Sequence, residues 1–260
     1  MSDLLAGKTV VVSGVGTGLG REIALAAYRD GANVMLGART EANLRAVAEE
    51  IDPSGERVAY RVTDILDRAA CERLIAGATE TFGGVDALAN VAAKEDVFGG
   101  LAHADLDQWR AMLDANVIGT LQLTQAAIPE LERGGGSVIF IGTQAAYHPQ
   151  IPQSAYATAK GALQPAMFSL ARELGPKKIR VNMVVPTWMW GPNVQMYVSA
   201  MAEQRGASED DVKRSISRNM PLGEIPEDGD VADSVIFFAS DRARMLTGQT
   251  IFVNGGEYFR

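Results

Sequence analysis

The sequence predicts an α/β fold: a Rossmann-like, doubly wound parallel sheet of about seven strands with helices on both faces. Short runs rich in β-branched residues alternate along the chain with longer amphipathic stretches. Seven such runs separated by helical patterns imply a parallel sheet that is covered on both sides. No internal repeat, linker or low-complexity tract interrupts the 260 residues. We therefore expect one domain, residues 1–260, with a single large core.

The expected strands lie, in chain order, at 8–13, 33–38, 57–62, 85–91, 136–142, 179–185 and 250–255. Helical patterns lie at 20–31, 67–82, 105–132, 155–174 and 228–239. A further helix is expected after the second strand, with Leu44, Val47, Ala48 and Ile51 along its apolar face. The 105–132 pattern is expected to break near Asn116.

A long insertion at 187–227 departs from this alternation. It opens with TWMWGP and contains an expected helix around 193–217. Long irregular excursions in compact domains usually form lids or binding loops. A contact between subunits is the alternative interpretation.

The composition argues against several kinds of binding partner and of site. Lys and Arg total 24 against 32 Asp and Glu, a net charge of −8, which disfavours general binding of nucleic acid or of an anionic membrane. Cys71 is the only cysteine, so an internal disulfide and CxxC metal sites are excluded. The start of the chain lacks the pattern of a secretory signal, and no apolar run approaches a membrane span. We expect a cytoplasmic protein without a metal site.

A glycine-rich loop joins the first expected strand to the first helix. Gly14, Gly18 and Gly20 are spaced as GxxxGxG, with Gly16 as an additional glycine. Glycine allows a sharp turn and the close approach of a ligand. The helix start that follows offers free N–H groups and a positive dipole end to a pyrophosphate. The context favours a dinucleotide site; a plain tight turn is the alternative.

Several motifs follow one another in a recognisable order: SGVGTGLG (13–20), TDI (63–65), NVAA (90–93), NVIG (116–119), YATAK (156–160) and LTGQTIFVNGG (246–256). Together they resemble the short-chain dehydrogenase/reductase family over essentially the whole chain. Ser13 stands where the family usually has threonine, and Ala93 replaces a glycine. The resemblance implies an oxidoreductase that transfers hydride between a nicotinamide coenzyme and a ketone or secondary alcohol, often as a homotetramer or homodimer. The helices at 105–132 and 155–174 would form the subunit contacts.

The resemblance also implies a set of coenzyme-binding residues: Ser13, Gly14, Gly16, Thr17, Gly18, Leu19, Asp64, Ile65, Asn90, Val91, Ala92, Tyr156, Lys160, Pro186, Thr187 and Trp188. The end of the second strand, where a carboxylate would bind the ribose 2′-hydroxyl of NAD, here carries Arg39 and Thr40. Arginine can pair with a 2′-phosphate. We therefore expect NADP(H) to be favoured over NAD(H). A solvated surface arginine is the alternative, and the glycine loop supplies no second basic residue.

Tyr156 and Lys160 are four residues apart and therefore share one face of the expected helix. The same face continues through Leu163, Met167, Leu170 and Leu174. A phenol with a reference pKa of about 10 needs help to act as a base near neutrality. A neighbouring ammonium and an oxidised nicotinamide both favour the phenolate. We therefore expect Tyr156 to be the acid/base, with Lys160 as its electrostatic partner and ribose ligand.

Two further catalytic residues come from the resemblance. Asn116 would help to hold a water linked to Lys160. Thr143 lies 13 residues before Tyr156, where the family has serine, and keeps a hydroxyl that can donate to the substrate oxygen. Tyr147, Trp188 and Trp190 suggest an apolar or aromatic substrate pocket; core packing is the alternative for each. A nucleotide-binding regulator or scaffold that lost the chemistry is the alternative function.

Overall fold

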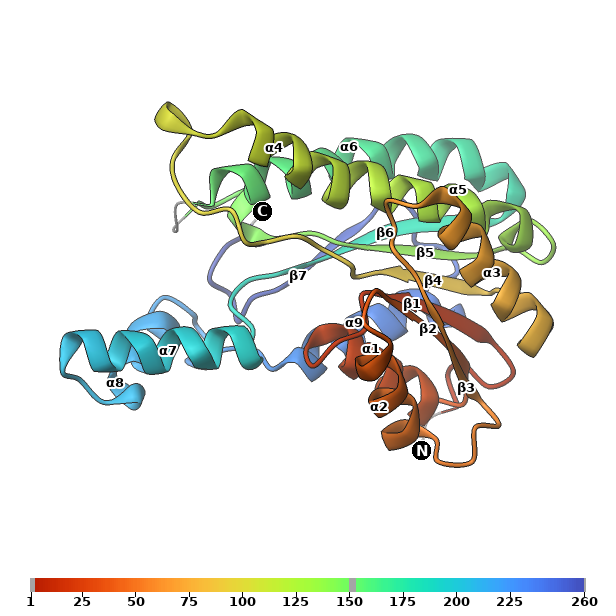
Figure 1. The fold of residues 1–260 in the computed structure, drawn as a ribbon, viewed down its shortest axis with the longest axis horizontal. Helices are drawn as coiled ribbons and strands as arrows, with labels where there is room; N and C mark the ends of the chain where they lie inside the picture. Colours follow the sequence, from red (N-terminus) through yellow and green to blue (C-terminus); the bar gives the residue numbers. More distant parts are fainter. Residues whose placement is uncertain (1–2, 150–152, 260) are drawn as a thin grey trace.

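The computed structural model describes residues 3–149 and 153–259, and its central feature is a seven-stranded parallel sheet (Figure 1). The strand order is β3-β2-β1-β4-β5-β6-β7. The strands are β1 (Thr9–Ser13), β2 (Asn33–Ala38), β3 (Val58–Val62), β4 (Ala87–Asn90), β5 (Gly136–Ile141), β6 (Ile179–Pro186) and β7 (Thr250–Val253). The prediction of a Rossmann-like α/β fold is confirmed, with each strand within three residues of its expected ends.

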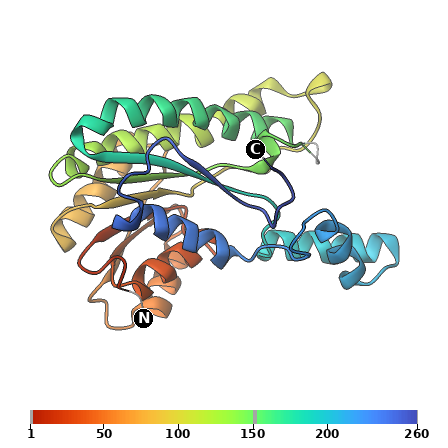
Figure 2. The same cartoon turned by 180° about the vertical axis from the view of Figure 1, so that it is seen from behind.

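Helices cover both faces of the sheet, as Figures 1 and 2 show from opposite sides. One face carries α1 (Leu19–Arg29), α2 (Glu41–Ile51) and α9 (Asp228–Ala239); the other carries α3 (Arg68–Phe82), α4 (Leu106–Leu113), α5 (Thr120–Leu131) and α6 (Ser154–Leu174). Short 3₁₀ segments lie at Leu101–His103, Gln144–Ala146, Gly175–Lys177 and Asp241–Ala243.

The two helical layers explain why the strands are apolar on both sides. Val10 and Val12 of β1 pack into the core under α1 and α9, whereas Val11 packs into the core under α3, α5 and α6. All three side chains are at most 1% exposed. Alternate residues of a strand point to opposite faces, so each layer receives its own row of side chains.

The order of the strands creates a switch point between β1 and β4. The chain runs outward from β1 to β3 and then returns to place β4 on the other side of β1. Ser13, the last residue of β1, is paired with Gly37 of β2 on one side and with Asn90 of β4 on the other. Ligands of open α/β sheets bind beyond the carboxyl ends of the strands at such a point.

The helical stretch at 105–132 is interrupted as expected. A π-helical segment, Asp114–Gly119, separates α4 from α5 and contains Asn116. The hydroxyl of Thr120 donates to the main-chain oxygen of Asn116 at 2.9 Å. Single π-helical turns inside α-helices are frequent at functional sites.

The insertion forms two helices that project from the carboxyl edge of the sheet as an arm (Figure 1). They are α7 (Pro192–Arg205) and α8 (Glu209–Ser217). The expectation of one helix over 193–217 is therefore wrong. Gly206 has a φ of 61° and ends α7 in the left-handed conformation, and Ser208 begins α8 with a capping box to Asp211. In the part of the chain that the structure describes, no helix has the length and apolarity needed to cross a membrane.

Candidate active site

The glycine loop lies at the switch point and packs against the segment that follows β4. Gly14 has a φ of 80°, and a Cβ added there would lie 2.3 Å from the Ala92 nitrogen. A Cβ on Gly20 would lie 2.4 Å from the Gly14 oxygen. A Cβ on Gly16, in contrast, would meet no atom within 4 Å. Gly14 and Gly20 therefore serve the close packing of the loop, while Gly16 borders open space.

Ser13 joins β1 to β4 beneath this loop. Its hydroxyl accepts from the Val91 and Ala92 nitrogens at 3.2 and 3.5 Å and donates to the Ala89 oxygen at 3.4 Å. Because serine supplies the required donor and acceptor, the replacement of the usual threonine leaves this connection in place.

The same corner has groups that fit the diphosphate of a dinucleotide. Gly18 is the N-cap of α1, without a side-chain cap, and Leu19 begins the helix, so main-chain N–H groups face the loop. Thr17 is exposed beside them. Asn90 donates its amide to the Thr124 hydroxyl at 3.2 Å, whereas its Oδ1 is buried without a hydrogen-bond partner among the described residues.

The sequence analysis missed Asp228, the first residue of α9. Its carboxylate is 9% exposed and lies 3.5 Å from the point where a Cβ of Gly18 would stand. Burial, together with Glu22 and Glu227, raises the pKa of Asp228. Its position beside the glycine loop comes from the contact of α9 with α1, which no local pattern reveals.

At the far end of the switch point, the predicted adenosine side carries the exposed Arg39. Arg39 is exposed just beyond β2 and forms no hydrogen bond or ion pair with another described residue. Thr40 is the N-cap of α2, although its hydroxyl makes no capping bond. Asp64 accepts from the Leu66 nitrogen at 2.9 Å, and the Ile65 oxygen accepts from the Gln122 amide at 2.9 Å. Both hydrogen bonds fix the turn after β3.

Tyr156 and Lys160 lie one turn apart on α6, beside the end of β5. The Lys160 amine is 5.9 Å from the centroid of the Tyr156 ring and donates to the Ile141 oxygen at 2.9 Å. Lys160 is 2% exposed, and burial lowers its pKa to about 8. Burial, with a smaller contribution from Glu95, raises the pKa of Tyr156. The expected lowering of the Tyr156 pKa by the ammonium is therefore not found, because removal from water disfavours the phenolate.

Asn116 is held by the loop after β4. Its Oδ1 accepts from the Lys94 nitrogen at 3.0 Å, and its amide donates to the Lys94 oxygen and to the Met112 sulfur, each at 2.8 Å. The side chain therefore fixes the backbone of that loop, and the predicted link through water to Lys160 stays a prediction. Thr143 lies two residues after the end of β5, and its hydroxyl accepts from the Ala145 nitrogen at 3.3 Å.

A buried polar network behind Thr143 also escaped the sequence analysis. Glu257 accepts from the Gln144 amide at 2.7 Å and from the Thr187 hydroxyl at 2.5 Å. The Gln144 oxygen in turn accepts from Asn254 at 2.7 Å. The network connects Gln144, the residue after Thr143, with Thr187. Thr187 follows Pro186, which is buried at the end of β6. In the sequence, the network is indicated only by the polar residues that come shortly after the apolar strands.

The predicted substrate residues separate into different environments. Tyr147 packs against Phe252 and Tyr258, with ring centroids 5.1 and 6.2 Å apart. Trp188 contacts Tyr197 of α7, with centroids 5.3 Å apart. Trp190 instead packs between α7 and α8.

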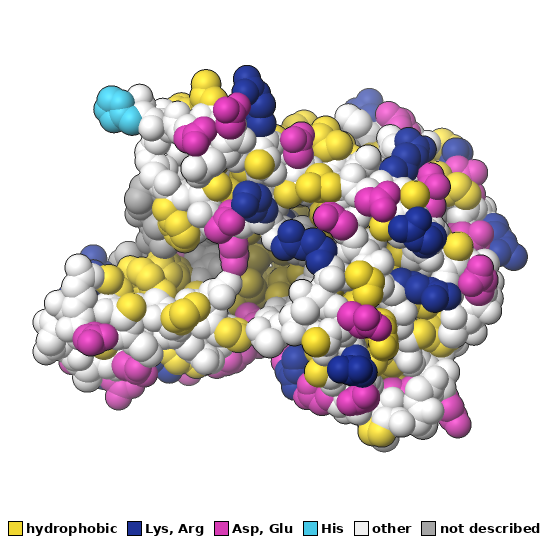
Figure 3. Space-filling view, viewed as in Figure 1, with side chains coloured by type: hydrophobic (Ala, Val, Ile, Leu, Met, Phe, Trp, Pro, Cys, Tyr) yellow, Lys and Arg dark blue, Asp and Glu magenta, His cyan; other side chains and the backbone are white. Residues whose placement is uncertain are grey.

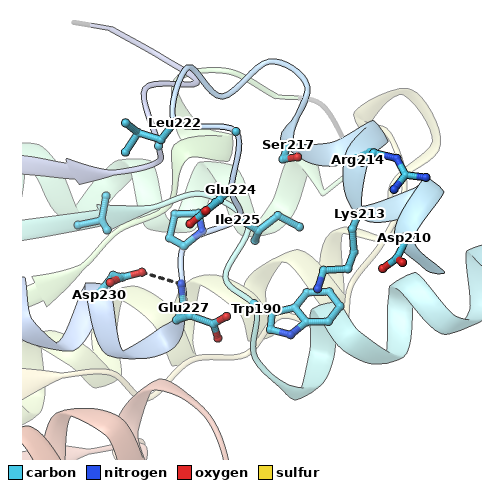
Figure 4. Close-up of a pocket in the computed structure, with 14 residues that line it drawn as sticks. Trp190, Asp210, Lys213, Arg214, Ser217, Leu222, Glu224, Ile225, Glu227 and Asp230 are labelled. Carbon is cyan, nitrogen blue, oxygen red and sulfur yellow. Dashed lines mark hydrogen bonds between the residues drawn. The ribbon is translucent and has the colours of Figure 1, made fainter.

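Trp190 lines a cavity of about 720 Å³ beneath α8 (Figure 4). The Lys213 amine lies over the indole ring, 3.8 Å from its centroid. Neither Tyr156 nor Thr143 lines this cavity. Among the described residues, no group of three or more His, Cys, Asp or Glu side chains is placed to hold a metal ion.

Comparison with known proteins places this site in a family. Residues 14–257 match the sequence model described as enoyl-(acyl carrier protein) reductase. The chain is 34% identical to human dehydrogenase/reductase SDR family member 4 over 255 residues, which cover 98% of this chain and 88% of the relative. The chain belongs to the short-chain dehydrogenase/reductase family. It is an oxidoreductase of the kind that acts on CH–OH groups with a nicotinamide coenzyme.

Other members show the range of this short-chain dehydrogenase/reductase fold. The chain is 30% identical to 2,5-dichloro-2,5-cyclohexadiene-1,4-diol dehydrogenase LinX of Sphingobium indicum over 257 residues, 98% of both chains. The crystal structure of a variant of actinorhodin polyketide ketoreductase with NADPH superposes with a TM-score of 0.88, at 25% identity and over 99% of both chains.

Proposed function

We propose that this protein is an NADP(H)-dependent oxidoreductase that interconverts a ketone and a secondary alcohol on a hydrophobic or aromatic small molecule. Tyr156 is the acid/base of the reaction. The observation that carries this proposal is the buried Lys160, one helical turn from Tyr156 and bonded to the main chain beside Thr143. A lysine in an apolar interior is costly unless its amine has a task.

The coenzyme supplies the hydride, or takes it up, at its nicotinamide ring. The glycine loop and the start of α1 hold the diphosphate, with Gly16 leaving room for it. Asp64 and Ile65 contact the adenine. The rest of the coenzyme is contacted by Val91, Ala92, Pro186 and Trp188. Thr187, fixed by Glu257, contacts the nicotinamide amide.

Tyr156 moves the proton. In ketone reduction the phenol donates its proton to the developing alkoxide, and the raised pKa of Tyr156 keeps the proton available. In alcohol oxidation the phenolate takes the proton, and the charged form of Lys160 stabilises it. Thr143 donates its hydroxyl to the substrate oxygen, and Asn116 holds a water that supplies Lys160 with protons.

Arg39 supports a preference for NADP(H). It is exposed beyond β2 and has no ion-pair partner among the described residues, so its guanidinium can pair with a 2′-phosphate. The related ketoreductase was crystallised with NADPH. Tyr147 and the Trp188–Tyr197 pair support an apolar or aromatic substrate. The name of the Sphingobium relative supports a cyclic secondary alcohol.

A turnover panel tests the proposal. Purified protein is assayed with cyclic and aromatic ketones plus NADPH or NADH, and with the matching alcohols plus NADP⁺ or NAD⁺. Tyr156→Phe removes only the hydroxyl, and we expect kcat to fall by at least ~100-fold because the proton has no carrier. Tyr60→Phe, far from the site on β3, is the matched control and should keep full activity.

The same panel tests the coenzyme. Arg39→Ala is expected to raise KM for NADPH by about 10-fold and to leave KM for NADH nearly unchanged. An unchanged preference in this variant would remove Arg39 from the site. Wild-type protein that binds NADPH but turns over no member of the panel would favour the alternative, a nucleotide-binding regulator or scaffold.

We also propose that the enzyme is cytoplasmic and homo-oligomeric. Large apolar side chains are exposed on the layer formed by α4, α5 and α6: Leu106 is 59%, Ile118 50% and Phe168 46% exposed. Large apolar side chains exposed on one layer are typical of sites of protein association.

A further inference from the structure

The segment after β4 carries three consecutive charged residues, of which one has no ionic partner. The main chain of Lys94 is clamped by Asn116 through two hydrogen bonds of 3.0 and 2.8 Å. The Lys94 amine pairs with Asp96 at 2.7 Å. Glu95, between them, forms no ion pair with another described residue. Its backbone therefore has a fixed position next to the π-helical segment, and its side chain is exposed.

The side chain of Glu95 reaches the arm. Its Oε1 accepts from the Asn193 amide at 2.5 Å, and Asn193 lies in the first turn of α7. Figure 3 shows the molecule hollowed between the arm and the main body, with hydrophobic side chains inside the hollow and charged ones at its rim. Through the bond to Asn193, Glu95 connects the segment after β4 with α7, and it keeps its second carboxylate oxygen for another donor.

The segment that carries Glu95 also packs beside the reacting groups, because Val97 and Tyr156 belong to one hydrophobic cluster. The charge of Glu95 adds to the raised pKa of Tyr156 and opposes the lowering of the pKa of Lys160 by burial. A negative charge beside Tyr156 opposes formation of the phenolate. The same charge favours the ammonium form of Lys160. A ligand that donates a hydrogen bond to the Glu95 carboxylate would offset the cost to the phenolate.

We propose that Glu95 is a substrate-binding, specificity-determining residue that accepts a hydrogen bond from a second hydroxyl of the substrate. The substrate class is then a diol, or the corresponding hydroxy ketone, on an apolar ring that packs against Trp188 and Tyr197. This inference rests on the proposed function: the first hydroxyl is oxidised beside Tyr156, and the second is held by Glu95 without reacting.

The chemistry of the site selects a hydroxyl over an ammonium group. An ionised carboxylate only accepts hydrogen bonds, so the ligand must donate. Lys160 already brings a positive charge to the same space, and a second cation there would be repelled. A site that hydrogen-bonds a substrate hydroxyl also discriminates against an analogue that lacks this hydroxyl.

The test compares matched alcohols. Cyclohexanol is set against its 1,2-, 1,3- and 1,4-diols, and 1-indanol against 1,2-indanediol, with the preferred coenzyme. In wild-type protein, kcat/KM for one diol is expected to exceed that for its mono-alcohol by about 10- to 100-fold. Glu95→Ala is expected to abolish this preference, so that the ratio of kcat/KM for the diol to that for the mono-alcohol falls to about one.

Two further variants make the result interpretable. Glu95→Gln keeps the bond to Asn193 and the shape of the side chain but removes the charge, so an intermediate preference is expected. Asp96→Asn changes the neighbouring carboxylate, which is already paired, and should keep the wild-type preference. Thermal unfolding of each variant shows whether it is folded.

Several outcomes would overturn the inference. In Glu95→Ala, these are a diol preference that survives, or equal losses of kcat/KM on diols and mono-alcohols. In the wild type, they are the absence of a diol preference, or faster turnover of 4-aminocyclohexanol than of the diols. Turnover of mono-alcohols without a diol preference defeats this inference alone. The absence of turnover for every alcohol and ketone, with either coenzyme, defeats the proposed function as well.

Discussion

At the scale of the residue, burial decides the chemistry of Lys160 and Tyr156 more than their proximity does. The amine of Lys160 is almost completely removed from water and has one neutral partner, the Ile141 oxygen. Its pKa therefore falls to about 8. The pKa of Tyr156 moves in the opposite direction for the same reason, because burial disfavours the charged form of either group.

This shift makes stability depend on pH. Between the folded pKa of about 8 and the unfolded value of 10.5, the unfolded chain binds more protons at Lys160, so its contribution to the free energy of unfolding rises with pH in that window. From pH 7.5 to 9.5 we expect wild type to gain about 2 kcal/mol relative to Lys160→Met. Urea unfolding of both proteins at each pH measures this difference.

Other groups also titrate near this pH range, but their effects on stability are the same in both proteins and cancel in the comparison. Burial raises the pKa of Cys71 to about 11, which lowers stability above pH 9 in both proteins alike. Lys177→Met, at an exposed ion pair with Glu132, is the control and should behave as wild type. Parallel pH curves for wild type and Lys160→Met would contradict the assignment of the titration to this amine.

At the scale of the element, the site is assembled from strand ends. Glu257, which follows β7, connects the loops after β5 and β6 because it receives hydrogen bonds from both Gln144 and Thr187. The three segments are more than 40 residues apart in the sequence. The parallel order of β5, β6 and β7 brings their carboxyl ends to one edge.

Removing the charge of Glu257 should therefore disturb the coenzyme site. In Glu257→Gln the Thr187 hydroxyl loses a charge-assisted hydrogen bond, and we expect the Kd of NADPH to rise by about 5- to 20-fold. Fluorescence titration gives the Kd, and urea unfolding gives the stability. Glu203→Gln, exposed on α7, is the control. A loss of stability without a change in Kd would show that the network only holds the fold.

At the scale of the whole molecule, the two helical layers differ in what they leave exposed. Figure 1 shows α4, α5 and α6 together on one face of the sheet. Leu106, Ile118 and Phe168 of this layer are exposed. The arm of α7 and α8 stands apart from both layers at the carboxyl edge of the sheet. Substrate access and subunit association are thus expected on different sides of the molecule.

The exposed layer leads to a prediction about assembly. Light scattering should give a mass of two or four chains of 27.7 kDa for the wild type. The double variant Ile118→Glu/Phe168→Glu should shift the mass toward the monomer, because buried unpaired charges disfavour the contact. Leu222→Glu, which is 79% exposed outside this layer, is the control. A monomeric wild type, or an unchanged mass in the double variant, would contradict the prediction.

The sequence by itself determined the strands, the glycine loop and the pairing of Tyr156 with Lys160. These features depend on residues within a few positions of one another, where periodicity and spacing are fixed by helix and strand geometry. It also indicated the irregularity at Asn116, although not its π-helical form.

Only the tertiary structure decided the features that join distant segments. Gly206 splits the arm into two helices that enclose Trp190, and the fold brings Asp228 to the glycine loop and Glu257 to Thr187. It also sets Glu95 against α7 and buries Tyr156 enough to raise its pKa. Desolvation and long-range contacts are properties of the packed molecule, so no local pattern of residues could specify them.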